Sequence, residues 1–253
     1  MLIQIGSELY RDGIDLTRPD FYTRLVDCEP YPTTTIPSVD VFRQAYENLV
    51  DEGATEILSL HITNSLSNML EVAHTAAAEV RKHPVTVFDS RQVSLGMGFL
   101  VESAAEAAAA DRCMVEIIES LKDQITRTYV VAILDMLEYL QRSGRMSSAV
   151  AGLGRMLKFK PLIKIYDGNP TAESVRTRER ATDRLVQTLS EIGPLERIAL
   201  LHSNAPDRAE DLRRKAETLL PAGDLRIMDI TPIIGVHTGP GAVGFACVAS
   251  RGK

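Results

Sequence analysis

The sequence predicts an α/β protein built from two α/β domains, the first with a mainly parallel sheet. In the middle of the chain, short runs rich in β-branched residues alternate with amphipathic helical segments, which is typical of a parallel sheet covered by helices. A chain of 253 residues is long enough for one large domain or two medium-sized ones. Its composition, 45% hydrophobic and 25% charged, is that of a globular protein and excludes a disordered or low-complexity chain.

The elements of the first half follow from apolar periodicity and from residues that start or stop helices. Ser38 is a helix-capping residue, apolar pairs four residues apart follow it, and Gly53 ends the pattern, which predicts a helix between them. The β-rich runs 56–62 and 85–88 are predicted as strands. Further helices are predicted near residues 69–80, 95–109 and 113–126.

The pattern changes after Thr128, so we predict a domain boundary there, with an N-terminal domain of residues 1–127 and a C-terminal domain of residues 128–253. Gly144 and Gly193 follow periodic apolar segments and mark helix C-termini. Helices are predicted at residues 133–142, 149–157, 178–192 and 206–219, and strands at 161–166, 197–201, 225–230 and 243–249.

Net charge and cysteine usage limit the classes of function. The formal net charge of −6 argues against capture of nucleic acid or of an anionic bilayer. Cys28, Cys113 and Cys247 lie far apart without CxxC spacing, which favours reduced thiols over disulfides or a zinc site. The uncharged segment 230–250 is too rich in proline and glycine for a membrane-spanning helix. With no signal peptide recognised, we expect a cytoplasmic protein without stable membrane insertion.

Common signatures of catalysis and cofactor binding do not occur in the sequence, among them the phosphate loop, HExxH and GxSxG. Residues 239–244 match GxGxxG, but a strand and not a helix is predicted after them, which excludes a dinucleotide site. The five histidines show no metal-ligand spacing. We therefore expect neither a cofactor nor a metal ion.

Three polar segments are candidates for a ligand site. The hydroxyl-rich segments 33–35 and 63–68 lie in predicted strand-to-helix connections, where parallel sheets bind ligands. Hydroxyl groups and free N–H groups at a helix start hold anions, although helix capping alone explains either segment more simply. The segment 237–241 combines an imidazole with two glycines that permit close backbone approach, and a tight turn is its simplest explanation.

Together, these segments resemble the motifs of the DegV family. Residues 32–38 (PTTTIPS) resemble the family's PTTSQPS segment, residues 63–69 (TNSLSNM) its SSxLSGT segment, and residues 237–242 its closing HTGPGA motif. Further matches in the same order are Phe88-Asp89-Ser90, Ser143-Gly144-Arg145-Met146-Ser147, Lys160-Pro161, Asp167-Gly168 and Val175-Arg176-Thr177-Arg178.

The resemblance implies a protein that binds one long-chain fatty acid between two α/β domains and presents the carboxylate to a separate fatty-acid kinase, which forms the acyl phosphate. It maps the carboxylate contacts onto Thr34, Ser67 and His237, whose hydroxyl and imidazole groups would satisfy the oxygens of a buried carboxylate. Such a protein is a carrier and not an enzyme by itself. The other residues expected at the site are Thr33, Asn68, Thr238 and Gly239, and those expected to dock the kinase are Arg176 and Arg178.

Three departures from the family pattern support alternative functions. The family's usual opening segment TDSTxDLP has no counterpart, so we expect either that the first strand is absent or that the start codon is misplaced. Asn68 and Met69 replace the glycine and threonine of LSGT, and Ile36 replaces a glutamine. One alternative is therefore a degenerate family member that acts as a partner-binding module. Another is an enzyme that uses His237 as general acid or base on a small anionic substrate.

Overall fold

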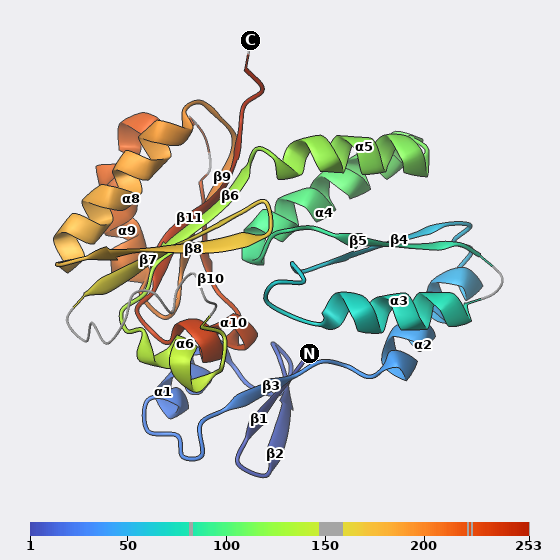
Figure 1. The fold of residues 1–253 in the computed structure, drawn as a ribbon, viewed down its shortest axis with the longest axis horizontal. Coiled ribbons are helices and arrows are strands. Elements are labelled where there is room, and N and C mark those ends of the chain that lie inside the picture. Colours follow the sequence, from blue (N-terminus) through green and yellow to red (C-terminus); the bar gives the residue numbers. More distant parts are fainter. Residues whose placement is uncertain (81–82, 147–158, 222, 224, 253) are drawn as a thin grey trace. The chain divides into compact units, whose positions relative to one another are not determined.

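The computed structural model describes residues 1–80, 83–146, 159–221, 223 and 225–252. The chain divides into two compact units (Figure 1). Unit 1 comprises Met1–Thr35, Arg127–Ile165 and Pro170–Lys253, and unit 2 comprises Ile36–Thr126 and Tyr166–Asn169. The first 35 residues thus group with the C-terminal part of the chain, whereas we expected them in an N-terminal domain of residues 1–127.

Unit 1 is built on a six-stranded sheet with the order β10-β9-β11-β6-β7-β8. The strand β9 pairs in parallel with β10 and antiparallel with β11, which in turn pairs antiparallel with β6, so the sheet is mixed. The bounds are β6 Thr128–Ile133, β7 Lys160–Tyr166, β8 Asn169–Val175, β9 Leu195–His202, β10 Arg226–Asp229 and β11 Val243–Ala249.

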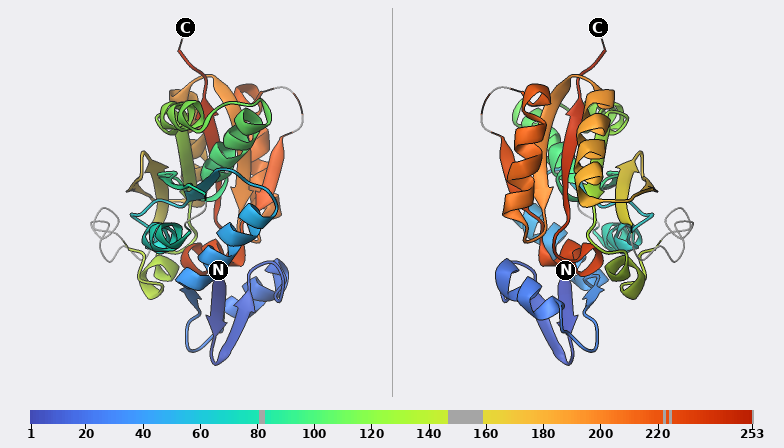
Figure 2. Two further views of the ribbon diagram at one scale, coloured as in Figure 1. Left: turned by 90° about the vertical axis from the view of Figure 1, so that its right-hand side faces the viewer. Right: turned by 90° about the vertical axis from the view of Figure 1, so that its left-hand side faces the viewer.

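The core of unit 1 lies between this sheet and two helices, α8 (Arg178–Ile192) and α9 (Pro206–Lys215). The strand β11 lies between two neighbours and is buried from Val243 to Val248, which explains its almost continuous apolar sequence. Leu185 and Leu189 of α8 and Leu212 of α9 pack on the same face of the sheet. The two helices lie side by side on that face (Figure 2).

A second sheet in unit 1 has the antiparallel order β2-β1-β3, with β1 at Leu2–Ile5, β2 at Glu8–Arg11 and β3 at Thr33–Thr35. A small core joins it to three helices through Ile3, Phe21, Tyr139 and Val236. These helices are α1 (Arg18–Leu25), α6 (Glu138–Arg142) and α10 (Pro232–Thr238). None of β1, β2, β3, α1 and α10 was predicted from the sequence.

Unit 2 follows the predicted alternation of strands and helices. The strands β4 (Ile57–His61) and β5 (Val85–Asp89) pair in parallel. The helices α2 and α3 contact each other, as do α4 and α5. Their bounds are α2 Val39–Asp51, α3 Met69–Glu79, α4 Ser94–Ala109 and α5 Met114–Ile125.

The predicted helix at residues 133–142 is wrong in its first part. Ile133 is the last residue of the strand β6 (Thr128–Ile133), which was not predicted, and only Glu138–Arg142 are helical. The sequence TYVVAI has the β-branched residues of a strand, and pairing with β11 fixes it in the sheet. The predicted helix 206–219 ends at Lys215 and is followed by a short 3-10 turn at Glu217–Leu219. The predicted helix 149–157 lies outside the described residues.

Candidate functional site

A threonine and a histidine from opposite ends of the chain meet in unit 1. Thr34 is the middle residue of β3, and its backbone pairs with Ile3 of β1. His237 lies in the last turn of α10. The Nε2 atom of His237 lies 3.3 Å from Oγ1 of Thr34, and both side chains are half-buried. The structure thus brings together two of the three predicted carboxylate contacts.

Close packing of α10 against α1 fixes the position of His237. A Cβ added at Gly235 would lie 2.7 Å from the Tyr22 hydroxyl and 2.8 Å from the Phe21 ring, so only glycine allows this approach. The Tyr31 hydroxyl donates a hydrogen bond to the carbonyl of Val236. The imidazole therefore projects from a helix held on two sides.

The imidazole of His237 is electrically neutral near pH 7. Burial lowers its pKa to about 4, and the positive charge of Arg145 acts in the same direction. Among the described residues, the buried Nδ1 atom of His237 has no hydrogen-bond partner. Leaving a buried polar atom without a hydrogen bond costs about 1–3 kcal/mol. A ligand atom that forms a hydrogen bond with Nδ1 would remove this cost. The site can form hydrogen bonds to an anion without forming an ion pair.

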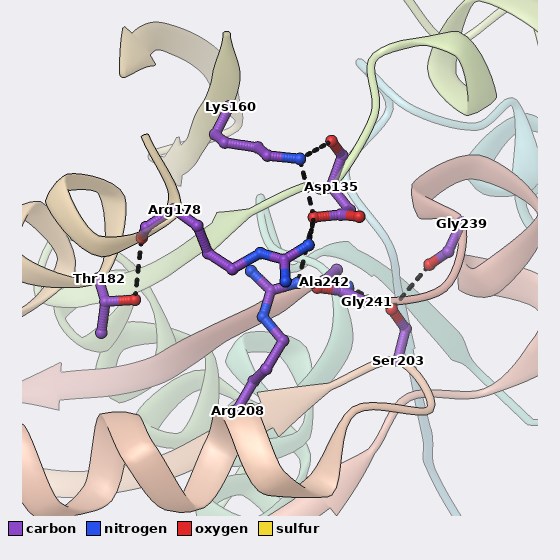
Figure 3. Close-up of polar contacts among 9 residues, drawn as sticks. All are labelled: Asp135, Lys160, Arg178, Thr182, Ser203, Arg208, Gly239, Gly241 and Ala242. Carbon is purple, nitrogen blue, oxygen red and sulfur yellow. Dashed lines mark hydrogen bonds and ion pairs between the residues drawn. The ribbon is translucent and has the colours of Figure 1, made fainter. Parts of the chain in front are cut away.

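The loop that follows His237 is held by a residue that sequence reasoning missed. Ser203 is fully buried; its hydroxyl donates to the carbonyl of Gly239 over 2.7 Å and accepts from the amide of Ala242 over 2.8 Å (Figure 3). The amide of Gly241 donates to the carbonyl of Ser203 over 2.7 Å. Nothing in the sequence distinguishes Ser203 from other serines after strands, because its role depends on the pairing of β9 with β11.

Gly239 and Thr238 have structural roles at the end of α10. Gly239 has a φ of +69°, and a Cβ there would lie 2.1 Å from the ring of Tyr139. The Thr238 hydroxyl donates to the carbonyl of Ile234 over 3.2 Å. The strand predicted after this loop is confirmed, because β11 begins at Val243.

Thr33 lies on the opposite face of β3 from Thr34, because side chains alternate along a strand, and it is exposed. Arg176 is exposed as well. The side chain of Arg178 forms a 2.9 Å ion pair with Asp135.

Ser67 and Asn68 lie in unit 2, in the turn that leads into α3. The Ser67 hydroxyl accepts a hydrogen bond from the amide of Met69 over 3.3 Å, and Asn68 is exposed at the N-cap position of α3. Earlier in the same turn, the hydroxyl of Ser65 donates to the carbonyl of Gly168 over 2.7 Å. The segment therefore contributes to capping and turn structure, as expected for hydroxyl residues at this place.

In the part of the chain that the structure describes, no group of three or more histidine, cysteine, aspartate or glutamate side chains is placed to hold a metal ion. None of the described helices combines the length and apolar character needed to cross a membrane.

The fold and the neutral hydroxyl–imidazole pair define an α/β protein with a site suited to hydrogen bonding an anion. A model of the DegV family, described as a family of uncharacterised proteins, matches residues 1–250. A DegV domain-containing protein of Streptomyces coelicolor is 31% identical over 256 residues, with 99% of this chain and 90% of the relative covered. The chain therefore belongs to the DegV family, as the sequence motifs indicated.

Solved structures resemble the fold closely. A DegV family protein from Thermus thermophilus, described as fatty-acid-binding, has a TM-score of 0.89 at 28% identity, with 98% of this chain and 90% of that chain covered. DegV from Bacillus subtilis, described as a fatty acid binding protein, has a TM-score of 0.86 at 28% identity, with 98% and 89% covered.

Proposed function

We propose that this protein binds a long-chain fatty acid and presents its carboxylate to a separate fatty-acid kinase, which forms the acyl phosphate. The observation that carries the proposal is the contact between Nε2 of His237 and the Thr34 hydroxyl, on an imidazole whose buried Nδ1 atom has no partner among the described residues. The relatives from Thermus thermophilus and Bacillus subtilis, which are described as fatty-acid-binding, support the choice of ligand.

Neutral donors suit a carboxylate that must later react. A cationic partner would neutralise the carboxylate, whereas the Thr34 hydroxyl and the neutral imidazole of His237 carry one proton each and leave its charge unchanged. Both groups donate to the carboxylate when it replaces their mutual contact. The acyl chain supplies the affinity: at about 0.8 kcal/mol per buried methylene, a sixteen-carbon chain offers roughly 11–12 kcal/mol before ordering costs. The carboxylate contacts therefore orient the ligand more than they retain it.

Ser67 supplies the third proposed contact to the carboxylate. In the described hydrogen bonds its oxygen only accepts, from the amide of Met69, so its proton is available to a ligand oxygen. Thr33, Asn68, Thr238 and Gly239 are proposed as supporting residues of the site. Thr238 and Gly239 support it by ending α10 at the right place, and Asn68 by starting α3.

The kinase is the proposed partner, and an arginine surface at the start of α8 is its proposed docking site. Arg176 is exposed there, and Arg178 is the first residue of the helix. Positively charged side chains attract an acidic partner surface and speed its encounter. The protein would carry no catalytic residue of its own in this reaction.

A reconstituted assay tests this function. The purified protein is loaded with palmitate and incubated with ATP and a bacterial fatty-acid kinase, and acyl phosphate is trapped as the hydroxamate. We expect product only when the kinase and the loaded protein are both present. A protein that retains bound palmitate but yields no acyl phosphate with kinases active on other DegV proteins would refute the presentation step while leaving fatty-acid binding intact.

A further inference from the structure

Four charged side chains meet in unit 1, and we call them the Asp135 cluster: Asp135, Lys160, Arg178 and Arg208 (Figure 3). The Oδ1 atom of Asp135 lies 3.0 Å from Nζ of Lys160, 2.9 Å from Nη2 of Arg178 and 3.4 Å from Nη1 of Arg208. The four residues come from the segment after β6, the start of β7, the start of α8 and the start of α9.

The cluster contains more positive charge than its single carboxylate can balance. Three cations share one oxygen of Asp135, so two positive charges are uncompensated within the cluster. Among the described residues, the buried Nη2 atom of Arg208 has no hydrogen-bond partner. Burial and the neighbouring charge of Arg178 lower the pKa of Arg208, although its guanidinium remains charged at neutral pH. The arrangement therefore costs free energy as long as no anion is bound.

Both arginines also occupy unfavourable positions on their helices. Arg178 is the first residue of the 15-residue helix α8, and Arg208 lies in the first turn of the 10-residue helix α9. Helix N-termini carry partial positive charge and disfavour cations. The other basic residues of α9 follow the usual preference and lie in its last turn: Arg213, Arg214 and Lys215.

We propose that the Asp135 cluster binds a phosphate-type dianion. A dianion matches the two uncompensated charges, the guanidinium groups offer paired donors to its oxygens, and the two helix N-termini add to the positive potential. This site goes beyond the proposed fatty-acid function: it uses none of Thr34, Ser67 and His237, and it shares only Arg178 with the proposed kinase-docking surface. The dianion comes either from inorganic phosphate or from the phosphoryl group of a nucleotide.

The cluster is open to solvent on one side. The side chain of Arg178 is 58% exposed, whereas that of Arg208 is 19% exposed. Arg208 also donates to the carbonyl of Gly241, so its guanidinium is fixed in place before an anion arrives. Arg178 would thus be the residue that closes on the anion, and Arg208 and Lys160 would form the floor of the site.

Calorimetric titration of the full chain with inorganic phosphate, and separately with ADP, at constant ionic strength tests the proposal. We expect saturable binding of one anion per chain. Arg178→Gln should weaken it about tenfold or more, because a charge-assisted contact is lost. Asp135→Asn should strengthen it, because the competing carboxylate is removed. Arg214→Gln, a matched control on α9 whose side chain is 67% exposed, should leave it unchanged.

The relative affinities for ADP and phosphate distinguish the two sources of the dianion. Tighter binding of ADP than of phosphate assigns the site to a nucleotide, and equal binding assigns it to free phosphate. The proposal is overturned if neither anion binds saturably, or if Arg178→Gln and Arg214→Gln have equal effects. Should Asp135→Asn fail to fold, the comparison of Arg178→Gln with Arg214→Gln decides alone, because both side chains are largely exposed.

Discussion

His237 Nε2 lies 3.3 Å from Thr34 Oγ1, although the two residues are 203 positions apart in the chain. The contact joins the edge strand β3 to the last turn of α10. Pairing with β1 fixes the strand, and the small core of unit 1 fixes the helix. It creates a polar site with no formal charge of its own, which is the arrangement that the proposed carboxylate contacts use.

Removing either member of this pair should weaken fatty-acid binding without unfolding the protein. We expect Thr34→Val and His237→Ala each to lower the affinity for palmitate about tenfold or more, because each removes a hydrogen bond to a charged group. Thr35→Val is the matched control, since Thr35 lies in the same strand and is exposed. Displacement of a fluorescent fatty acid measures the affinities. Equal effects of Thr34→Val and Thr35→Val would contradict the site assignment.

The stability of the protein should depend on His237 at acidic pH. Its pKa of about 4 lies below the unfolded value of about 6.5, so the unfolded chain binds the proton more tightly. The free energy of unfolding should therefore fall as the pH decreases from about 6.5 to about 4. Burial also lowers the pKa of His61 and of His202, and both contribute with the same sign.

Urea unfolding of the wild type and of His237→Gln at several pH values isolates this contribution. The variant should lose less stability than the wild type between pH 6.5 and pH 4.5, because one of the three histidines no longer titrates. Identical pH profiles of the two proteins would show that the burial of His237 does not shift its pKa.

Gly239 should tolerate substitution less well than another glycine in a similar conformation. Gly239 (φ 69°, ψ 177°) and Gly193 (φ 90°, ψ −154°) both end helices in a region of backbone space that favours glycine. A Cβ at Gly193 meets nothing within 4 Å, whereas at Gly239 it meets the Tyr139 ring. Gly239→Ala should therefore destabilise the protein by about 1–3 kcal/mol more than Gly193→Ala, measured by thermal unfolding. Equal losses would mean that the ring moves aside freely.

Ser203→Ala should loosen the loop that follows His237. The substitution leaves two buried groups, the amide of Ala242 and the carbonyl of Gly239, without their hydrogen bond to the Ser203 hydroxyl. We expect the free energy of unfolding to fall by about 2 kcal/mol or more. Thr75→Ala, which removes a similar hydroxyl-to-carbonyl hydrogen bond at an exposed position of α3, is the control. Hydrogen exchange at the amide of Ala242 reports the effect directly. Unchanged protection there would show that Ser203 does not hold the loop.

The sequence predicted unit 2 well because its signals are local. Periodic apolar residues, the cap at Ser38 and the stop at Gly53 define α2 without reference to the rest of the chain. The strand β6 was not predicted, because apolar residues continue past its end at Leu134, Met136 and Leu137 and suggest a helix there. Its burial depends on pairing with β11, which lies more than 100 residues later.

The sequence singled out individual residues of the candidate site, but it did not predict how they are arranged in space. Family motifs singled out Thr34 and His237, yet β3 has only three residues and was read as a connection. Pro232 is a usual first residue of a helix and could have indicated α10, which places His237 on a helix and not in a turn. The role of Ser203 and the Asp135 cluster both arise from contacts between segments far apart in the chain, so no local sequence pattern predicts them.

Native mass spectrometry of the protein, as purified from a bacterial host and again after extraction of lipids, tests the proposed function most directly. We predict one adduct per chain with the mass of a long-chain fatty acid, which is lost on extraction and restored by incubation with palmitate. A protein that carries no adduct and remains without one after incubation would contradict fatty-acid binding.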